Sequence, residues 1–346
     1  MARNYSSLDL VRHCDAFPYE KTQPAEFTAR MKGLVPVEWS DSSTNTAAAY
    51  LIAYMPRTVA DAFVTIPKPE LEAMGLASDL DLQTAIESSN KFPLRQLLHL
   101  QTTEPARTAT LARLFQYWRE ANTFKVLRGW RSELWPVYGQ NGELLFSVER
   151  AAIGLLGAVR YGVHMTAYVQ DAGTGDVKIW VPRRAADKST YPSMLDNTVA
   201  GGLMTGEDPF ECLVREADEE AALPEAVVRA NTQSVGTLTY IYITDERAGG
   251  ESGYISPECQ WVYDLPLPAA VVPRPKDGEV ESFMLCSVAE VREQLAQGLF
   301  KPNCAAVLID FLMRHGLLSG DDESAFETIA SRLHRVLPFP GPHNNS

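Results

Sequence analysis

Two patterns of apolar and polar residues divide the chain near residue 150. Before that point, apolar residues recur every three or four positions in several short segments, which predicts amphipathic helices. These segments are 7–13, 60–64, 80–87, 92–100 and 108–121. Segments 130–138 and 144–148 flank an Asn-Gly pair and predict a β-hairpin. We therefore expect an α+β N-terminal domain at residues 1–150.

The rest of the chain is dominated by strand patterns around one central helix. Strands are predicted at 164–170, 177–182, 198–200, 236–244, 260–265 and 282–286. Later helices are predicted at 287–297, 303–315 and 324–336. This order indicates the α/β class, with helices packed against a sheet. We place this domain at residues 151–320 and a C-terminal helix and tail at residues 321–346.

The composition limits the partners. The 346 residues include 31 Lys and Arg against 44 Asp and Glu, for a net charge of −13. So acidic a surface repels phosphate backbones and anionic membranes, so we expect no nucleic acid polymer and no membrane as a partner. A small phosphorylated ligand remains possible if a divalent cation lies between it and the protein. An oligomer is possible as well.

The N-terminus and the cysteines agree with a cytoplasmic protein. The first ten residues contain no apolar stretch of the kind that a secretory signal needs. The five cysteines are scattered and form no C-x-x-C pair, so we expect neither a structural zinc site nor a disulfide framework.

The central helix carries an unusual concentration of carboxylates. Asp208 suits its N-cap and Pro209 its first turn. Glu216, Glu219 and Glu220 follow at helical spacing and therefore share one face. From residue 207 to residue 220 there are seven acidic residues and one basic residue. Hard oxygen ligands on a rigid element are what Mg²⁺ binds, and Mn²⁺ is possible too.

The same segment resembles the Nudix box, G-x5-E-x7-R-E-U-x-E-E-x-G-U, in which U is bulky and apolar. The matching residues are Gly201, Glu207, Arg215, Glu216, Glu219, Glu220 and Leu223. Two positions depart from the box: Ala217 is small, and Ala222 replaces a glycine that usually ends the helix. An alanine there should cost about 1 kcal/mol or shift the turn.

The resemblance implies a Nudix α/β/α sandwich with a mixed sheet, and a Mg²⁺-dependent diphosphohydrolase. Glu216, Glu219 and Glu220 would be metal ligands, and the Gly201 carbonyl would complete the set. Arg215 would orient the glutamates and Glu207 would support it. Glu216 and Glu219 are both candidates for the general base. Glu279, in a later acidic loop, is a further candidate ligand.

A narrower resemblance covers nearly the whole chain. It rests on segments 130–138, 161–168, 180–184, 191–202 and 300–303. These are similar to the thiamin pyrophosphokinase-related Nudix group, which carries a DUF4743-type N-terminal domain. The group implies hydrolysis of thiamin diphosphate, and preferentially of its damaged oxo- and oxythiamin forms, to the monophosphate and phosphate. Candidate substrate-binding residues are Arg183, Arg184, Asn197 and Trp135.

Two alternatives stay open. The box handles a diphosphate and not the group attached to it, so a damaged nucleotide such as 8-oxo-dGDP is a second candidate substrate. A non-catalytic Nudix-fold binding module is the alternative of another class. Such modules usually lose box glutamates, and this chain keeps them.

Overall fold

The computed structural model describes residues 4–40, 49–319 and 324–344. The predicted C-terminal tail begins at residue 321, so residues 321–323 and 345–346 of it lie outside the described residues. None of the described helices combines the length and the apolarity that crossing a membrane requires.

A mixed sheet of six strands forms the centre of the C-terminal part. The strands are β5 (Arg160–Gln170), β6 (Val177–Arg184), β7 (Val199–Gly202), β8 (Gln233–Ile243), β9 (Ile255–Pro266) and β10 (Val280–Ser287). The main path runs β10-β6-β5-β9-β8, and β7 pairs with the first half of β5. β5 and β9 are parallel, and the other pairs are antiparallel. The mixed sheet is therefore confirmed.

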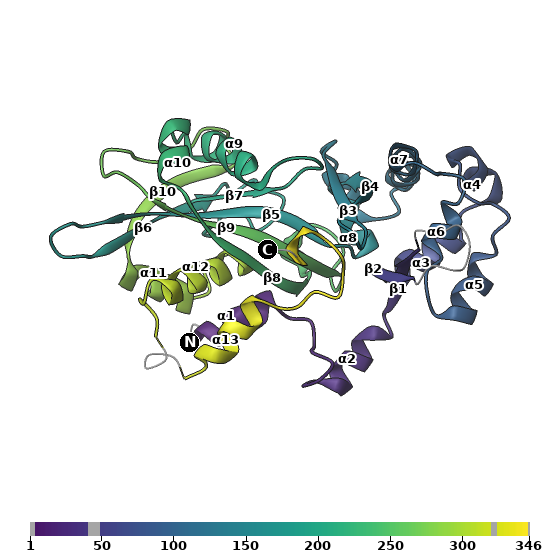
Figure 1. Cartoon of the computed structure of the whole chain (residues 1–346), viewed down its shortest axis with the longest axis horizontal. Coiled ribbons are helices and arrows are strands. Elements are labelled where there is room, and N and C mark those ends of the chain that lie inside the picture. The colour runs from purple at the N-terminus through teal and green to yellow at the C-terminus, as the bar shows by residue number, and fades with distance from the viewer. Residues whose placement is uncertain (1–3, 41–48, 320–323, 345–346) are drawn as a thin grey trace.

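Helices cover both faces of this sheet, as Figure 1 shows. On one face lie α9 (Pro209–Ala221) and α10 (Glu225–Asn231), and on the other lie α1 (Ser7–Cys14), α11 (Val288–Ala296), α12 (Pro302–Arg314) and α13 (Phe326–Leu333). The expected α/β/α sandwich is confirmed. Leu10 and Val11 of α1 are buried in the same core as α12, so α1 packs with the domain that we placed at residues 151–320.

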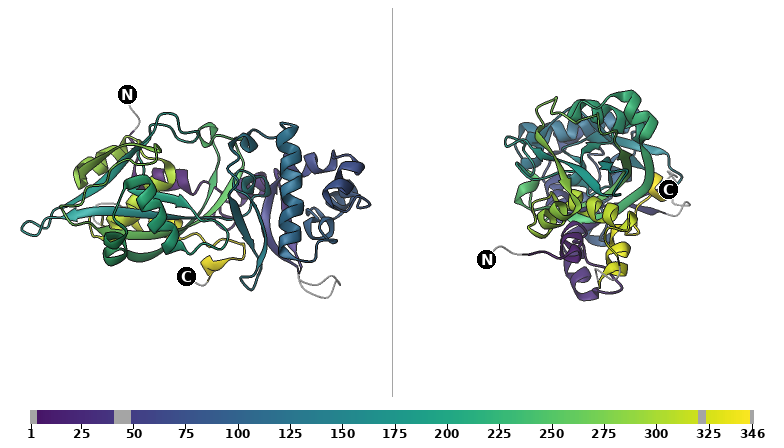
Figure 2. Two further views of the ribbon diagram at one scale, coloured as in Figure 1. Left: turned by 90° about the horizontal axis from the view of Figure 1, so that it is seen from above. Right: turned by 90° about the vertical axis from the view of Figure 1, so that its left-hand side faces the viewer.

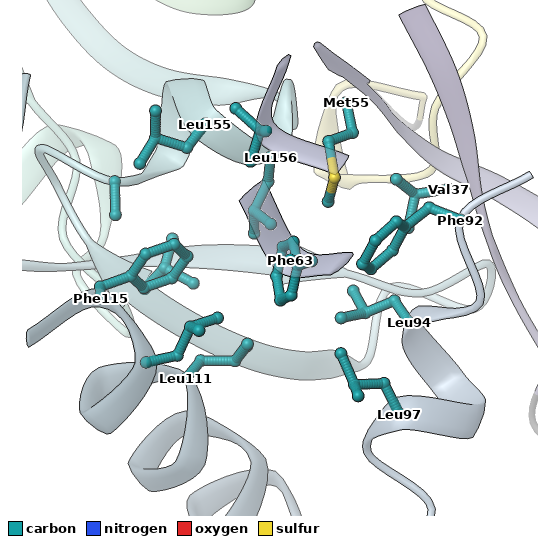
Figure 3. Packing of buried hydrophobic residues seen from close by; sticks show 14 of the residues in the cluster. Val37, Met55, Phe63, Phe92, Leu94, Leu97, Leu111, Phe115, Leu155 and Leu156 are labelled. Carbon is teal, nitrogen blue, oxygen red and sulfur yellow. The ribbon is translucent and has the colours of Figure 1, made fainter. Parts of the chain in front are cut away.

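The N-terminal part lies at one end of the sandwich and has its own core (Figure 2). It contains the hairpins β1 (Leu34–Trp39) with β2 (Tyr50–Pro56) and β3 (Leu134–Tyr138) with β4 (Leu144–Glu149), and the helices α3 (Arg57–Val64), α4 (Lys68–Met74), α5 (Leu82–Ser89), α6 (Leu94–Leu97), α7 (Glu104–Glu120) and α8 (Ile153–Leu156). Helix α2 (Pro24–Met31) precedes β1, and its Phe27 and Met31 pack against the core of the six-stranded sheet. In Figure 3, Phe63 packs among aliphatic side chains from several of these elements. Phe92 and Trp118 contact its ring at centroid distances of 4.6 and 4.7 Å.

Helix α9 begins and ends as its sequence requires. The side chain of Asp208 accepts hydrogen bonds from the backbone N–H groups of Phe210 and Glu211 at 2.8 and 3.2 Å. Leu213 and Ala217 are buried against the sheet, which anchors the helix. Ala222 ends it in the left-handed conformation, with φ 51° and ψ 34°. The turn that a glycine usually makes in the box is therefore kept and not shifted.

Replacing Ala222 with Gly should stabilise the protein by about 1 kcal/mol, because glycine adopts positive φ without steric cost. The matched control is Ala289→Gly on the exposed side of α11, which should destabilise the protein by about 1 kcal/mol. Urea denaturation of the full chain measures both. A loss of stability in A222G as large as that in A289G would contradict the strain at residue 222.

Candidate active site

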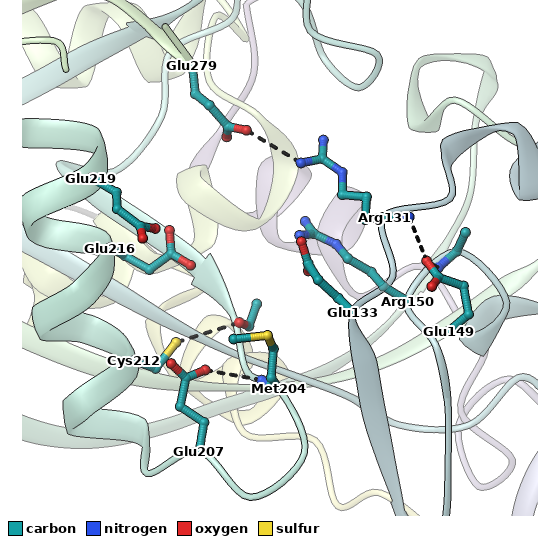
Figure 4. A network of polar contacts seen from close by, with 12 residues as sticks. Arg131, Glu133, Glu149, Arg150, Met204, Glu207, Cys212, Glu216, Glu219 and Glu279 are labelled. Carbon is teal, nitrogen blue, oxygen red and sulfur yellow. Dashed lines mark hydrogen bonds and ion pairs between the residues drawn. The ribbon is translucent and has the colours of Figure 1, made fainter. Parts of the chain in front are cut away.

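Three carboxylates of α9 differ strongly in burial. The Glu219 side chain is 48% exposed, the Glu216 side chain is 15% exposed, and Glu220 is buried. Figure 4 shows Glu216 and Glu219 pointing from α9 toward Arg131 and Arg150. The three carboxylates therefore share one face of α9, as expected, and their exposure to solvent falls from Glu219 through Glu216 to Glu220.

Arg215 holds two of these carboxylates in place. Its Nη1 donates to Glu216 Oε1 at 2.8 Å and to Glu219 Oε2 at 2.9 Å. Its Nε and Nη2 donate to the two oxygens of Glu207 at 2.9 and 3.2 Å. Glu207 in turn accepts from the backbone N–H of Met204 at 3.3 Å. Bidentate pairing of this kind fixes orientation as well as charge.

Strand β7 passes directly against the side chain of Glu216, so a larger residue at position 201 would displace that carboxylate. A Cβ on Gly201 would lie 2.3 Å from the carboxyl carbon of Glu216. One residue earlier, the backbone N–H of Ala200 donates to Glu220 Oε2 at 3.0 Å. The β7 backbone therefore contacts both of the less exposed carboxylates.

The electrostatics of the Glu216 and Glu220 carboxyl groups beside β7 favour a bound cation. Burial raises the pKa of Glu216 to about 7; Arg215 counteracts the rise and Glu219 adds to it. Burial, reinforced by the charges of Glu216 and Asp196, raises the pKa of Glu220 well above its ordinary value. Because burial is the main cause, the ionised form of each carboxyl group is poorly solvated, and a bound cation would stabilise it.

The donor set therefore fits Mg²⁺ or Mn²⁺ in kind and in charge, since it offers carboxylate oxygens and the Gly201 carbonyl. Across the described ranges, no three His, Cys, Asp or Glu side chains already surround a point that could hold a metal ion. Arg215 occupies oxygens of Glu216 and Glu219 instead. Each of these carboxylates has a second oxygen that accepts no hydrogen bond from Arg215, and metal ligation would use those oxygens.

A cavity of about 520 Å³ adjoins this edge. Gly201, Gly202 and Glu220 line it on the side of α9, and Lys125, Arg128, Arg131, Trp135 and Arg150 line it on the side of the N-terminal part. The cavity therefore lies where the two parts of the chain meet. A concave site of this size with several polar groups is suited to a small molecule.

The candidate substrate-binding residues lie in two different environments. Trp135 and Arg184 line the cavity, and Arg184 forms an ion pair with Asp196 at 2.6 Å. Arg183 does not line it and donates to the carbonyl of Ser193 at 2.8 Å. Asn197 is buried beside the cavity and hydrogen-bonds His164 Nδ1 at 2.7 Å. A binding role for these residues stays a prediction.

Glu279 reaches the site from the loop before β10, opposite α9. It forms ion pairs with Lys188 and, at 3.5 Å, with Arg131. Although burial opposes the shift, these cations lower its pKa. As placed, Glu279 holds two basic side chains of the cavity wall, and metal ligation by Glu279 stays a prediction.

Sequence reasoning did not anticipate Arg131, Arg150, Arg160 and Lys188 at this site. All four line the cavity, although Arg131 and Lys188 are 57 residues apart in the sequence. No motif joins them. The one available signal was the basic character of the segment from residue 125 to residue 131, next to the predicted hairpin.

Replacing Gly201 with Ala should lower the turnover of a diphosphate substrate about 100-fold. The new Cβ would displace the Glu216 carboxylate, and displacements of about 1 Å cost about this much in rate. Gly33→Ala is the control, because a Cβ at Gly33 meets its nearest atom at 3.6 Å. Steady-state kinetics test the prediction, and unchanged kcat in G201A would contradict the contact as the reason for this glycine.

Comparison with known proteins agrees with this geometry. Residues 160–304 match the family model of the NUDIX domain, and residues 88–160 match the "Domain of unknown function (DUF4743)". The chain therefore matches a NUDIX domain over residues 160–304 and, directly before it, the DUF4743 domain. The resemblance to both families is confirmed, with the DUF4743 match covering part of residues 1–150.

Similar proteins occur in yeast and plants. "Uncharacterized protein YJR142W" of Saccharomyces cerevisiae is 42% identical over 62% of this chain and 64% of its own length. "Nudix hydrolase 20, chloroplastic" of Arabidopsis thaliana is 40% identical over 60% of this chain and 53% of its own length. The chain thus spans between half and two thirds of the length of these relatives. Among solved structures, DR0079 from Deinococcus radiodurans aligns over 59% of this chain and 100% of its own, with 17% identity and a TM-score of 0.35.

Proposed function

We propose that this chain is a divalent-metal-dependent hydrolase that cleaves the diphosphate bond of a small molecule. The observation that carries the proposal is the arrangement of three carboxylates beside strand β7. Glu216 and Glu220 lie against β7, Arg215 holds Glu219 beside Glu216, and Glu220 lines a cavity rich in basic side chains. Bound Mg²⁺ would lower the pKa of a water molecule and neutralise diphosphate charge.

The chain's own residues would divide the remaining work. Arg215 holds the carboxylates of Glu216 and Glu219, and Glu207 holds Arg215. A carboxyl pKa of about 7 suits Glu216 to accept a proton near neutral pH. Glu219 is more exposed and is the second candidate base. A non-catalytic module has no need of such an arrangement, which is why we favour an enzyme.

For the substrate we propose thiamin diphosphate and, preferentially, its oxo- and oxythiamin forms, with the monophosphate and phosphate as products. The support is the resemblance of segments 130–138 and 191–202 to the thiamin pyrophosphokinase-related group. Aromatic side chains of Tyr191 and Tyr242 line the cavity and offer surfaces for a flat ring. A damaged nucleotide such as 8-oxo-dGDP is the second candidate, because purines stack equally well.

A substrate panel with Mg²⁺ tests the assignment. Phosphate release would be scored for oxothiamin diphosphate, thiamin diphosphate and 8-oxo-dGDP at matched concentrations. We expect the highest kcat/KM for oxothiamin diphosphate. A higher value for 8-oxo-dGDP would overturn the substrate while leaving the reaction intact.

The setting of the enzyme is also part of the proposal. We place it in the cytoplasm, acting on a small diphosphate, with neither a nucleic acid polymer nor a membrane as partner. The Arabidopsis thaliana relative is itself named chloroplastic. Fractionation of cells that produce the tagged full chain tests the location.

A further inference from the structure

The cavity is strongly basic, although the whole chain is acidic. Its lining includes eight basic side chains and three carboxylates, a local excess of five positive charges in a chain with a net charge of −13. The basic residues are Lys125, Arg128, Arg131, Arg150, Arg160, Arg184, Lys188 and Lys301, and the carboxylates are Glu220, Glu258 and Glu279. Low-dielectric walls focus such a field and attract anions.

Four of the eight basic side chains in the cavity lining form an ion pair with a carboxylate. Arg184 pairs with Asp196, Lys188 with Glu279, and Arg150 with Glu133 at 2.9 Å. Arg160, the first residue of β5, is different. Its buried Nε has no hydrogen-bond partner, and no carboxylate in the described part of the chain forms an ion pair with its guanidinium.

The neighbour that would be expected to pair with Arg160 is occupied elsewhere. Glu258 lies opposite Arg160 in the register of β5 and β9. Its oxygens accept hydrogen bonds from Tyr240 Oη at 2.7 Å, Ser256 Oγ at 2.8 Å and Gln260 Nε2 at 3.0 Å. Arg160 therefore faces the cavity without a protein acceptor.

A second donor in the cavity wall is also unpaired. The indole Nε1 of Trp135 is buried and has no hydrogen-bond partner among the described residues. Gly202 leaves room for this ring, since a Cβ there would lie 2.4 Å from ring carbon Cζ2. Arg150 lies over the ring, 5.3 Å from its centroid. Trp135 thus lies between Gly202 of β7 and Arg150.

Both unpaired groups are donors, and this selects the chemistry of the ligand. A buried donor without an acceptor costs about 1–3 kcal/mol, so the ligand should supply acceptors. It should also be anionic, because the surrounding charge is positive. A terminal phosphate meets both conditions better than an internal one, since it has three non-bridging oxygens instead of two and carries up to two negative charges instead of one. The cationic thiazolium ring of thiamin meets neither.

We infer that the cavity contains a binding site for an unesterified phosphate group, with Arg160 and the indole N–H of Trp135 as its donors, and that this site holds the terminal phosphate of the substrate. The inference deepens the proposed function and rests on it. It also gives the N-terminal part a role, because Trp135, Arg131 and Arg150 form one wall of the site. Substrates that carry a free terminal phosphate should therefore be preferred over substrates whose diphosphate is esterified at both ends.

Binding without turnover tests the site separately from the reaction. The probe is methylenediphosphonate, titrated calorimetrically into the full chain with EDTA present. We expect Arg160→Gln to weaken binding at least 10-fold and Trp135→Phe to weaken it about threefold. Arg292→Gln, which removes an exposed arginine of α11, should leave the dissociation constant unchanged. Wild-type affinity in both R160Q and W135F would overturn the site, whatever the enzyme assays show.

A thermal measurement separates binding from a structural role. Because Arg160 has no partner in the free protein, R160Q should melt at or above the wild-type temperature while losing the stabilisation by methylenediphosphonate. A lower melting temperature with undiminished stabilisation would show that Arg160 is structural and would overturn the inference.

The substrate preference is a third readout. ADP and the symmetric diester P1,P2-diadenosine diphosphate share a base and differ in the free terminal phosphate. With Mg²⁺, we expect kcat/KM for ADP to exceed that for the diester at least 10-fold, and R160Q to reduce this ratio toward one. Equal or better turnover of the diester by the wild type would contradict the terminal-phosphate assignment. If neither compound is hydrolysed, the proposed function fails, and the calorimetric result still decides the site.

Discussion

Replacing Glu219 with Gln is expected to lower kcat on a diphosphate substrate by on the order of 1,000-fold, a loss comparable to removal of a single preorganised electrostatic group from an active site. Glu219 is about half exposed and accepts one hydrogen bond, from Arg215. The amide keeps its size and loses its charge, so a cation and its water would be held less well while the fold is kept. Steady-state kinetics with saturating Mg²⁺ measure the effect.

The matched control lies one residue earlier on the same helix. Asp218 is exposed and forms an ion pair with Lys276 at 2.7 Å. Asp218→Asn should keep kcat within about twofold of the wild type, since exposed ion pairs contribute little. Metal-dependent activity that survives in E219Q at the level of D218N would refute the catalytic role of this face.

The second large effect concerns stability and pH. Burial raises the pKa of Glu216 to about 7, against an ordinary value of 4.5. Between these two pH values the folded protein keeps a proton that the unfolded chain has lost, so the stability of the metal-free protein falls as pH rises through this window. The loss amounts to about 3 kcal/mol. Glu216→Gln removes the titration, and metal-free E216Q should therefore be more stable than the wild type at pH 8 by up to this amount.

Urea denaturation in EDTA at pH 5 and at pH 8 measures this difference. The wild type should lose stability between the two values, and E216Q should lose less. Adding Mg²⁺ at pH 8 should stabilise the wild type and have little effect on E216Q, because binding to the folded state alone shifts the unfolding equilibrium. If the unfolding free energies of the wild type and E216Q changed equally between pH 5 and pH 8, the raised pKa of Glu216 would be refuted.

The helix and its carboxylates were predictable because their order is local. The spacing of Glu216, Glu219 and Glu220 places them on one face wherever a helix forms, and Asp208 with Pro209 fixes where it begins. The resemblance to the Nudix box also predicted that Arg215 pairs with nearby glutamates, and in the structure it donates hydrogen bonds to Glu207 and Glu216. Even the departure at Ala222 was readable, and the strain at that residue is now visible as a positive φ.

The basic cavity was not predictable from the sequence. Its wall combines Arg131 and Arg150 of the N-terminal part with Arg160 and Lys188 of the NUDIX domain, and only the tertiary fold brings them together. A net charge of −13 suggested the opposite character. Likewise, the pattern of residues 7–13 predicted a helix, but nothing local indicated that Leu10 and Val11 would pack beside α12 at the far end of the chain.

The central claim is that the α9 face makes this chain a metal-dependent diphosphate hydrolase. Its most direct test is phosphate release from oxothiamin diphosphate by the purified full chain, measured with Mg²⁺, with EDTA, and with Mg²⁺ restored after EDTA. The account predicts turnover that disappears in EDTA and returns with Mg²⁺, and that is on the order of 1,000-fold slower in E219Q with Mg²⁺. Release that is unaffected by EDTA, or equal in E219Q and the wild type, would contradict it.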